Sequence, residues 1–153
     1  MSGVLHRAGP GDLDDLLMLV REFCHDEQHT FDQDRVLAGL RTLLADDALG
    51  QVWLVRDPEH PGEAAGYAVL TWAWSLACGG YQCLVDELHV RAHGNDLARR
   101  VLAELLDVAQ AGGAARVLVE TEAHDRRARE FFGAAGFDLT DSVFMSLPVS
   151  RER

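Results

Sequence analysis

The sequence predicts an α/β domain (α+β) with a mixed, mostly antiparallel sheet, and three observations carry this prediction. Segments with strand-like and helix-like patterns follow one another in the order β-α-α-β-β-β-α-β-α-β. One strand–helix–strand passage in the second half needs a crossover connection, which makes its two strands a parallel pair. The chain of 153 residues, 48% hydrophobic and 25% charged, suits one folded core, so we expect a single domain over residues 1–153.

The first third of the chain supplies one strand and two helices. Residues 4–8 (VLHRA) alternate apolar and polar side chains, which predicts a short strand. Asp12 is the expected N-cap of a helix in which leucines and valine recur at three- and four-residue spacing as far as Phe23. A second helix with the same kind of apolar stripe is predicted to begin near Asp32 and to end before Gly50.

The middle of the chain reads as three long strands. Residues 51–56 and 65–77 are rich in β-branched and aromatic side chains and flank a Pro/Gly loop at 57–63, which predicts an antiparallel hairpin. A Gly-Gly turn then leads into a third strand over residues 81–90. The three segments therefore form a meander.

The last third alternates helices and strands. Residues 97–109 carry leucine or valine along one helical face and are followed by Gly112-Gly113, which predicts a helix with a glycine stop. A strand over 116–122, a helix over 126–135 and a final strand over 143–149 complete the predicted order.

Charge and composition exclude several classes of function. The formal net charge is −11, so the field of the protein repels phosphate backbones and anionic lipids, and we expect neither nucleic acid nor membrane as a partner. Three cysteines without regular spacing predict neither a disulfide framework nor a zinc site, and His25 and His29 read as a solvated helix end, so no metal is expected. With no signal peptide recognisable, the expected location is the cytoplasm.

Two stretches, residues 81–102 and 115–139, resemble the GNAT superfamily of acyl-CoA-dependent N-acyltransferases. The first is similar to the family's strand with its Q/R-x-x-G-x-G/A loop, and the second to the strand, A-x-x-F-Y and G-F pattern that closes the fold. The second match is the more specific, because four residues fall at the family's spacing: Ala128, Phe131, Gly136 and Phe137.

The resemblance implies acetyl-CoA, or another acyl-CoA, as co-substrate. A helix N-terminus presents free N–H groups and a partial positive charge, which favours the docking of a pyrophosphate. The segment that matches this loop is His93, Gly94, Asn95, Asp96, Leu97 and Ala98. The resemblance also implies that the backbones of Leu88 and Val90 pair with the acyl and pantetheine portion, and that Asp125 takes the position of an asparagine that contacts the cofactor.

The site also departs from the family pattern. Asp96 places a side chain and a negative charge at the central glycine of the loop, which Arg99 and Arg100 would offset in part. Phe132 stands where the family has a tyrosine that can protonate the leaving thiolate. Three readings stay open: an N-acetyltransferase with an eroded loop, a GNAT-fold binding or assembly module without catalysis, and an enzyme whose acyl donor lacks a pyrophosphate.

The resemblance implies Glu87 as the general base, and period-two alternation predicts that Glu87 shares a face with Val85 and His89. The alternative is a glutamate that only hydrogen-bonds a loop. For the acceptor, an amine of a small molecule or peptide, the resemblance suggests three acidic residues near the first two helices and one aromatic residue that is either core or pocket wall: Asp26, Glu27, Asp32 and Trp72. Many proteins of this fold pair through sheet edges or C-terminal strands, so a homodimer is expected.

Overall fold

The computed structural model describes residues 3–91 and 95–150 and divides the chain into two units, Met1–Glu120 and Thr121–Arg153. The first unit holds the sheet, and the second holds a short helix and the tail. Within the described residues the elements run β1 (Leu5–Arg7), a 3-10 turn (Pro10–Asp12), α1 (Leu13–Asp26), α2 (Gln33–Ala45), β2 (Gly50–Arg56), β3 (Ala64–Ser75), β4 (Gly80–Val90), α3 (Asn95–Ala111), β5 (Ala114–Val119) and α4 (Arg126–Ala134).

The sheet of the first unit is mixed, as the sequence predicts. Its strands lie in the order β1-β2-β3-β4-β5, and each pair is antiparallel except β4 with β5. The parallel pair is the one that α3 connects, because a crossover is the only way to bring two consecutive strands side by side in the same direction. The fold class and its one parallel pair are therefore confirmed.

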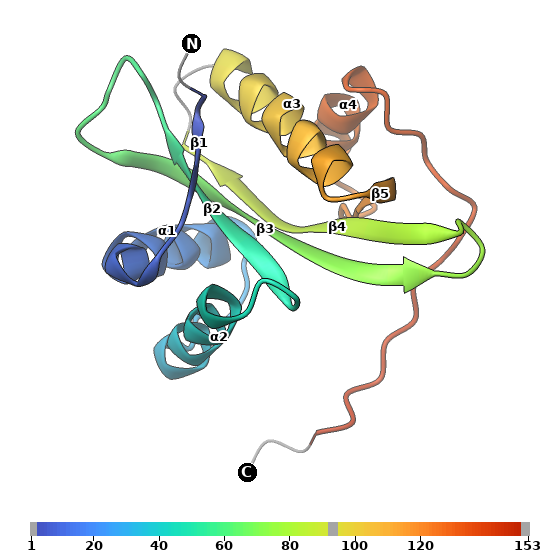
Figure 1. The fold of residues 1–153 in the computed structure, drawn as a ribbon, viewed down its shortest axis with the longest axis horizontal. Helices are drawn as coiled ribbons and strands as arrows, with labels where there is room; N and C mark the ends of the chain where they lie inside the picture. Colours follow the sequence, from blue (N-terminus) through green and yellow to red (C-terminus); the bar gives the residue numbers. More distant parts are fainter. Residues whose placement is uncertain (1–2, 92–94, 151–153) are drawn as a thin grey trace. The chain divides into compact units, whose positions relative to one another are not determined.

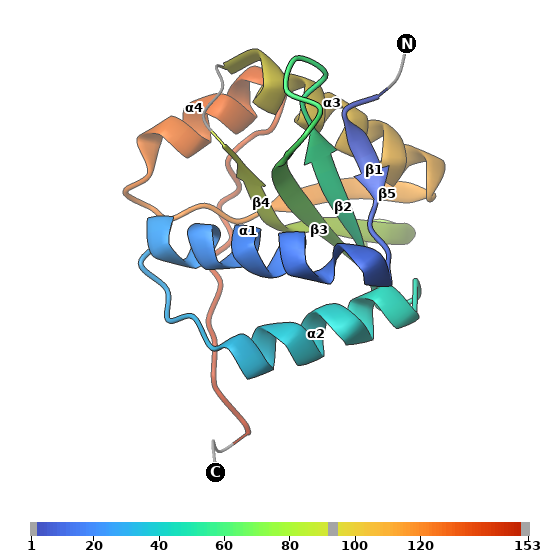
Figure 2. The same cartoon turned by 90° about the vertical axis from the view of Figure 1, so that its left-hand side faces the viewer.

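Helices cover both faces of this sheet (Figure 1). The helices α1 and α2 lie side by side on one face, and α3 lies on the other (Figure 2). The α1/α2 face has a core built around Leu16, Leu19, Leu54, Tyr67 and Val69, all at most 2% exposed. The α3 face has its own core, in which the fully or almost fully buried members include Val55, Ala68, Leu70, Cys83, Val101 and Leu105.

The caps of the two N-terminal helices differ. Asp12 stands at the N-cap of α1 as predicted, but its side chain makes no capping bond there; Oδ2 accepts the Gly9 N–H at 2.8 Å and closes the preceding turn. Asp32 caps α2 with its side chain, because its Oδ1 accepts the N–H of Arg35 at 3.2 Å. The predicted start of the second helix is confirmed.

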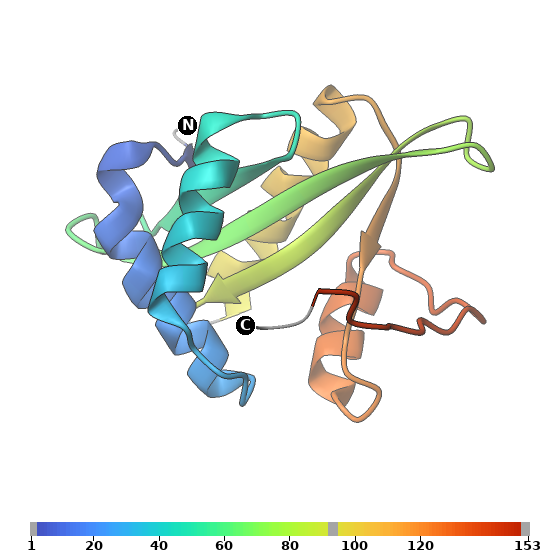
Figure 3. The ribbon, with the colours of Figure 1, turned by 90° about the horizontal axis from the view of Figure 1, so that it is seen from below.

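The long β3–β4 hairpin forms the centre of the sheet (Figure 3). Gly66 on β3 is opposite Val90 on β4, and the strands approach so closely there that a Cβ on Gly66 would lie 2.1 Å from the carbonyl oxygen of His89. Such a separation is far inside van der Waals contact, so glycine is required for the space it leaves. This close approach holds the last residues of β4 in place.

Helix α3 is tied to the start of the chain by one glutamate. The Glu104 carboxylate accepts the Val4 N–H at 2.9 Å and the Leu5 N–H at 2.9 Å. Val4 directly precedes β1 and Leu5 is its first residue, so the carboxylate accepts two backbone donors at the edge of the sheet.

The second unit is small. Asp125 caps α4 by accepting the Ala128 N–H at 3.0 Å, and the rings of Phe131 and Phe137 pack edge-on against Phe132 with centroids 5.2 and 5.6 Å away. Residues 138–150 have no regular secondary structure, so the predicted strand over 143–149 is wrong for this structure. The segment is apolar, but a strand also needs a neighbour to hydrogen-bond, and none pairs with this segment among the described residues.

Candidate active site

The pairing between β4 and β5 ends halfway along β4. It runs from Tyr81 opposite Ala114 to Val85 opposite Val119, and there β5 stops. β4 continues to Val90, paired only with β3 on its other side. Within residues 3–91 and 95–150, one edge of β4 is therefore free of a strand partner over residues 86–90, and this opening is the setting of the site.

The open edge exposes the backbone of two residues named from the sequence. Arg91 donates its N–H to the Ala65 carbonyl at 2.7 Å, so its backbone groups face β3. Because successive residues of an antiparallel strand alternate between the two sides, Glu87 and His89 also face β3 with their backbone groups. Leu88 and Val90 turn theirs toward the side where β5 has ended, which leaves N–H and C=O groups that an extended ligand can pair with.

A bulge at Asp86 decides which way the side chains of this segment point. Val85 pairs with Leu70 and Glu87 pairs with Val69, so Asp86 is an extra residue on β4. The extra residue reverses the alternation. Val85 lies in the α3-face core, whereas Glu87 follows Val69 to the α1/α2 face. The prediction that Glu87 shares a face with Val85 is wrong, and the prediction that it shares one with His89 holds.

Glu87 is half-buried, and its surroundings raise its proton affinity. Burial raises the pKa of the Glu87 carboxyl above its usual range, and the negative charge of the adjacent Asp86 raises it further. His29, which follows α1, and the Tyr67 hydroxyl on β3 act in the opposite direction. A carboxylate whose pKa moves toward neutrality is better matched to taking a proton from an amine than an exposed one.

Tyr67 is a site residue that sequence reasoning missed. It lies on β3 directly opposite His89, and the two rings are 6.3 Å apart at a tilt of 52°. Burial, and next the charge of Glu87, raise the pKa of Tyr67 far above its usual range, so the hydroxyl keeps its proton. The only sequence signal was a tyrosine within the apolar first half of β3, which reads as core.

A charged network around Glu22 was missed as well. Arg91 donates two hydrogen bonds to the Glu22 carboxylate, from Nε to Oε2 at 3.0 Å and from Nη2 to Oε1 at 2.6 Å. His89 Nε2 lies 3.2 Å from the same Oε2. The Arg91 hydrogen bond is the main reason that the pKa of Glu22 is lowered. His89 and Arg91 are 67 and 69 positions from Glu22 in sequence, so no local pattern could have grouped them.

This network borders a cavity of about 580 Å³. Its lining comes from α1 and the end of β4: Arg21, Glu22, His25, Asp26, His89, Val90 and Arg91. Asp26, predicted to contact an amine, lies with Oδ2 4.0 Å from His89 Nδ1. The cavity therefore joins a predicted acceptor residue to the open edge of β4 through Val90, and to the Glu87 face through His89.

The other predicted acceptor residues are not gathered here. Glu27 is exposed at the end of α1, and the carboxylate of Asp32 caps α2. Trp72 packs on the α3 face, where a Cβ on Gly112 would lie 2.6 Å from its ring, while Glu87 points to the opposite face. The core reading of Trp72, which the sequence left open, is the one that its packing supports.

The residues of the predicted acyl-CoA loop are only partly described. His93 and Gly94 lie outside the described residues, and Asn95 is the first residue of α3. The Asp96 side chain is 97% exposed, and Arg99 Nη1 lies 3.8 Å from its Oδ1, so the predicted offset by an arginine is present. Leu97 is a buried core residue, which leaves its backbone as the group available to a cofactor, and Ala98 is half-buried.

Asp125 and Phe132, the two candidates of the second unit, have local structural roles. The Asp125 carboxylate is occupied as the N-cap of α4, a function that asparagine or aspartate can serve equally. Phe132 is buried between two other phenylalanine rings. Neither role requires a cofactor.

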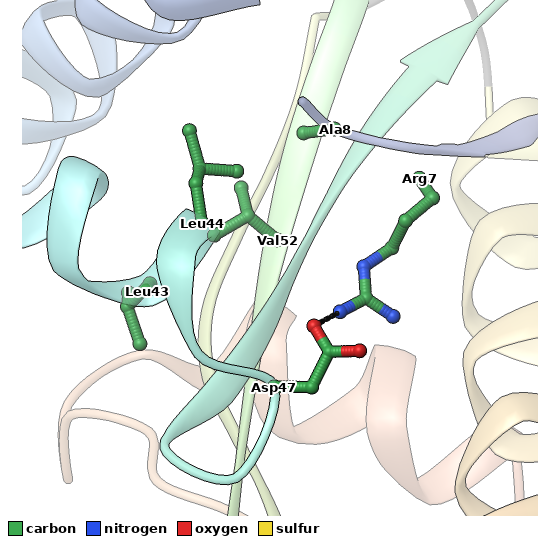
Figure 4. Close-up of a pocket in the computed structure, with 6 residues that line it drawn as sticks. All are labelled: Arg7, Ala8, Leu43, Leu44, Asp47 and Val52. Atoms are coloured by element: carbon green, nitrogen blue, oxygen red, sulfur yellow. Dashed lines mark hydrogen bonds and ion pairs between the residues drawn. The ribbon is translucent and has the colours of Figure 1, made fainter. Parts of the chain in front are cut away.

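A second, smaller cavity of about 190 Å³ lies between β1, α2 and β2 (Figure 4). Arg7 and Asp47 form an ion pair across it, and its apolar walls are Leu43, Leu44 and Val52. Because Arg7 and Asp47, the charged residues of its lining, are paired with each other, this cavity presents fewer groups that could bind or activate a substrate than the cavity beside His89.

Metal and thiol chemistry gain no support from the described part of the chain. Residues 3–91 and 95–150 hold no group of three or more His, Cys, Asp or Glu side chains placed to bind a metal ion. The three cysteines are free, and burial raises the pKa of Cys83 to about 11, so this thiol keeps its proton and is a poor nucleophile. No helix in the described residues combines the length and apolarity that a membrane crossing requires.

Comparisons with known proteins agree with this architecture. The model of the acetyltransferase (GNAT) family matches residues 14–137. An integron cassette protein from the mobile metagenome of Cole Harbour Salt Marsh superposes with a TM-score of 0.84 at 26% identity, over 97% of this chain and 92% of that one. A possible acetyltransferase from Clostridium difficile 630 gives a TM-score of 0.84 at 14% identity, over 96% and 97%.

A further similar structure is an aminoglycoside acetyltransferase from an uncultured soil metagenomic sample, solved with sisomicin. It has a TM-score of 0.73 and 13% identity, over 96% of this chain and 95% of that one. None of the curated proteins matches the sequence. The match over residues 14–137, most of the chain, shows that this chain belongs to the acetyltransferase (GNAT) family.

Proposed function

We propose that the protein transfers an acetyl group from acetyl-CoA to an amine of a small molecule or peptide by direct attack. The amine nitrogen bonds to the thioester carbonyl carbon, the carbon–sulfur bond breaks, and the proton of the amine passes to Glu87, directly or through water. Direct transfer suits a site in which both substrates meet in one cleft, since proximity then supplies much of the rate.

The observation that carries this proposal is the open edge of β4. An extended acyl chain needs partners that are themselves extended, and Leu88 and Val90 present unpaired backbone groups over the length that β5 leaves uncovered. Those contacts depend on the backbone alone, so the unusual loop sequence around Asp96 does not remove them. Coenzyme A supplies the activated thioester when it is bound.

The arrangement of charges supports a cationic acceptor. Asp26 contributes a largely exposed carboxylate to the cavity beside Val90, and the whole chain carries a net charge of −11. Two arginines, Arg21 and Arg91, also line the cavity, and Arg91 is paired with Glu22, so Asp26 is the acid that we propose binds an ammonium group drawn in by the field of the whole chain. Because an aminoglycoside acetyltransferase of similar fold was solved with sisomicin, aminoglycosides and other small polyamines are the first acceptors to test.

Phe132 removes the expected proton donor for the leaving thiolate. Thiolates are stable enough to leave unprotonated, so we expect turnover without a tyrosine acid, with solvent completing the proton balance. The reaction should then be slower than in a relative that has the tyrosine.

Calorimetric titration with acetyl-CoA separates this proposal from a module without catalysis. The transferase proposal expects binding in the micromolar range. No heat and no thermal shift at millimolar acetyl-CoA would favour a binding or assembly module without catalysis. Asp96 and Phe132, the two departures from the family pattern, are the residues that suggest this alternative. A donor without a pyrophosphate, such as acyl-pantetheine, is titrated in parallel; binding of that donor alone points to the third reading.

Replacement of the proposed base tests the chemistry. Glu87→Gln keeps the shape of the side chain and removes its ability to accept a proton, so the acetylation rate should fall by about 100-fold or more. Glu59→Gln, in the β2–β3 loop, is the matched control and should leave the rate unchanged. Equal rates for wild type and Glu87→Gln would exclude Glu87 as the base.

We also propose a homodimer. Residues 143–149 are mostly apolar, and five large side chains among them are 78–94% exposed: Val143, Phe144, Met145, Leu147 and Val149. Large apolar side chains in a row are rarely left in water, and a second copy is the partner that is always available.

A further inference from the structure

The imidazole of His89 is oriented by an ion pair between a strand and a helix. Arg91 donates two hydrogen bonds to the Glu22 carboxylate, and His89 Nε2 lies 3.2 Å from Glu22 Oε2. The Arg91 hydrogen bond is the main reason that the pKa of Glu22 is lowered, so this carboxylate is ionised at neutral pH and can only accept hydrogen bonds. His89 Nε2 is therefore the donor to Glu22.

This hydrogen bond decides which nitrogen of His89 is left as an acceptor. A neutral imidazole carries one N–H and one lone pair, so with the proton on Nε2 the lone pair is on Nδ1. His89 Nδ1 lies 4.0 Å from Asp26 Oδ2, a separation too long for a hydrogen bond. We call these two atoms the acceptor pair. One donor nitrogen at the ordinary length of about 2.9 Å can reach both of them.

The acceptor pair belongs to the lining of the 580 Å³ cavity. The His89 side chain is only 11% exposed, whereas that of Asp26 is 62% exposed, so the pair joins a shielded lone pair to an accessible carboxylate. A group that enters between them gives up water on the His89 side. Entry is favourable only for a group that returns hydrogen bonds to both acceptors, and an ammonium group is the strongest such donor.

The two arginines of the cavity lining are engaged by other partners. Arg91 is bound to Glu22. Arg21 Nη2 donates to Gln33 Oε1 at 3.2 Å, and the Arg21 guanidinium lies 4.9 Å from the centroid of the Phe31 ring. These contacts hold both guanidinium groups, which leaves the acceptor pair to a cation from the ligand.

We propose that His89 is a specificity-determining residue: its Nδ1 and the Asp26 carboxylate together bind a second ammonium group of the acceptor, so the preferred substrate is a diamine. The inference rests on the proposed function, in which the reacting amine lies beside Glu87. His89 follows Glu87 by two residues on the same face, about 6.6 Å along the strand. A short alkyl diamine such as putrescine spans this distance, with a neutral nitrogen at Glu87 and a charged one at the acceptor pair.

The same geometry disfavours a monoamine of equal length. Butylamine would place a methyl group between His89 Nδ1 and Asp26 Oδ2. Both acceptors would then lose water without gaining a donor, which is the way in which a polar site rejects an analogue that lacks the matching group. Glu22 and Arg91 act through His89 and are positioning residues for this selection.

The first readout requires no acetyl transfer. Nitrogen NMR of the His89 imidazole at about pH 8.5, where imidazoles are neutral, should show the proton on Nε2. Putrescine should shift the Nδ1 resonance, assigned through bonds, and butylamine at the same concentration should leave it in place. A proton found on Nδ1 instead, or a resonance that putrescine does not move, overturns the inference.

The second readout is the ratio of kcat/KM for putrescine to kcat/KM for butylamine. We expect the wild type to prefer putrescine by about tenfold or more, mainly through a lower KM. His89→Leu removes the lone pair and Asp26→Asn removes the charge, so each should bring the ratio close to one by raising the KM for putrescine. Asp14→Asn, an exposed acid at the start of the same helix α1, is the matched control and should keep the preference.

The outcomes separate this inference from the proposed function. Equal kcat/KM for the two amines in the wild type overturns the inference, as does a preference that survives in both His89→Leu and Asp26→Asn. If the wild type acetylates neither amine while putrescine still shifts the His89 resonance, the ammonium site stands and the proposed function is rejected. If neither variant folds, the NMR of the wild-type protein decides.

Discussion

At the residue scale, the fold places the Glu87 carboxyl in surroundings that disfavour its charged form. The carboxylate is half-buried next to Asp86, and both burial and the neighbouring charge raise its pKa. A site that only needed stability would place an apolar side chain on this face beside Tyr67 and Val69. Retaining an acid there is the kind of local cost that functional sites carry.

The cost can be measured without any substrate. The folded protein holds the Glu87 proton more tightly than the unfolded chain does, whose reference pKa is 4.5. Stability therefore falls as pH rises from about that value through the raised folded-state pKa, and the penalty persists above it. We expect Glu87→Gln to melt at a higher temperature than wild type at pH 7.

Thermal melts of both proteins across the pH range show whether Glu87→Gln is more or less stable than wild type at each pH. The difference between Glu87→Gln and wild type should shrink as the pH falls and vanish below the unfolded-state value of 4.5, where both side chains are neutral. A variant that is less stable than wild type at pH 7 would mean that the ionised carboxylate stabilises the fold, which is the opposite of what a raised pKa predicts.

At the element scale, the hairpin of β3 and β4 builds the site. Gly66 brings the strands together, the bulge at Asp86 turns Glu87 to the α1/α2 face, and the early end of β5 opens the edge at Leu88 and Val90. Each of these features acts on the same five residues of β4. The geometry of the site is therefore a property of the backbone more than of any side chain.

A methyl group at Gly66 should disturb this hairpin. Its Cβ would lie 2.1 Å from the His89 carbonyl oxygen and 2.9 Å from the Val90 Cα, so backbone atoms must move. We expect Gly66→Ala to lower the free energy of unfolding by about 1 to 3 kcal/mol in urea denaturation.

The control for this prediction is Gly39→Ala in α2. A Cβ at Gly39 meets nothing within 4 Å, and alanine is the better helix former, so this variant should gain up to about 1 kcal/mol. Equal effects of the two substitutions would show that the close approach at Gly66 is not a constraint.

Element by element, the sequence predicts the frame better than the details of the site. Side-chain periodicity is a local signal, so α1, α2, α3 and the β2–β3–β4 meander could be read from it. The bulge at Asp86 left no such signal and reversed the face expected relative to Val85. The Glu22–His89–Arg91 network depends on residues far apart in sequence, which only the folded chain brings together.

At the scale of the whole molecule, the open question is what covers the tail. In an extended chain Met145 and Ser146 point to opposite sides, and the apolar side chains at 143, 145, 147 and 149 fall on the side of Met145. If a second copy covers that side, a charge placed there is buried and a charge on the other side is not.

We therefore expect Met145→Asp to convert the dimer to monomer in sedimentation equilibrium, while Ser146→Asp leaves it dimeric. The two variants carry the same added charge, so net repulsion cannot account for a difference between them. A wild-type protein that stays monomeric at the highest attainable concentration contradicts the proposed dimer.

The central claim is that the unpaired edge of β4 binds the acyl arm of acetyl-CoA. Residue-resolved amide hydrogen exchange measures it directly, because Glu87 and His89 pair with β3 whereas Leu88 and Val90 face the open side. We predict that saturating acetyl-CoA slows exchange at Leu88 and Val90 and leaves Glu87 and His89 nearly unchanged. Unaltered exchange at Leu88 and Val90 in millimolar acetyl-CoA would contradict the claim.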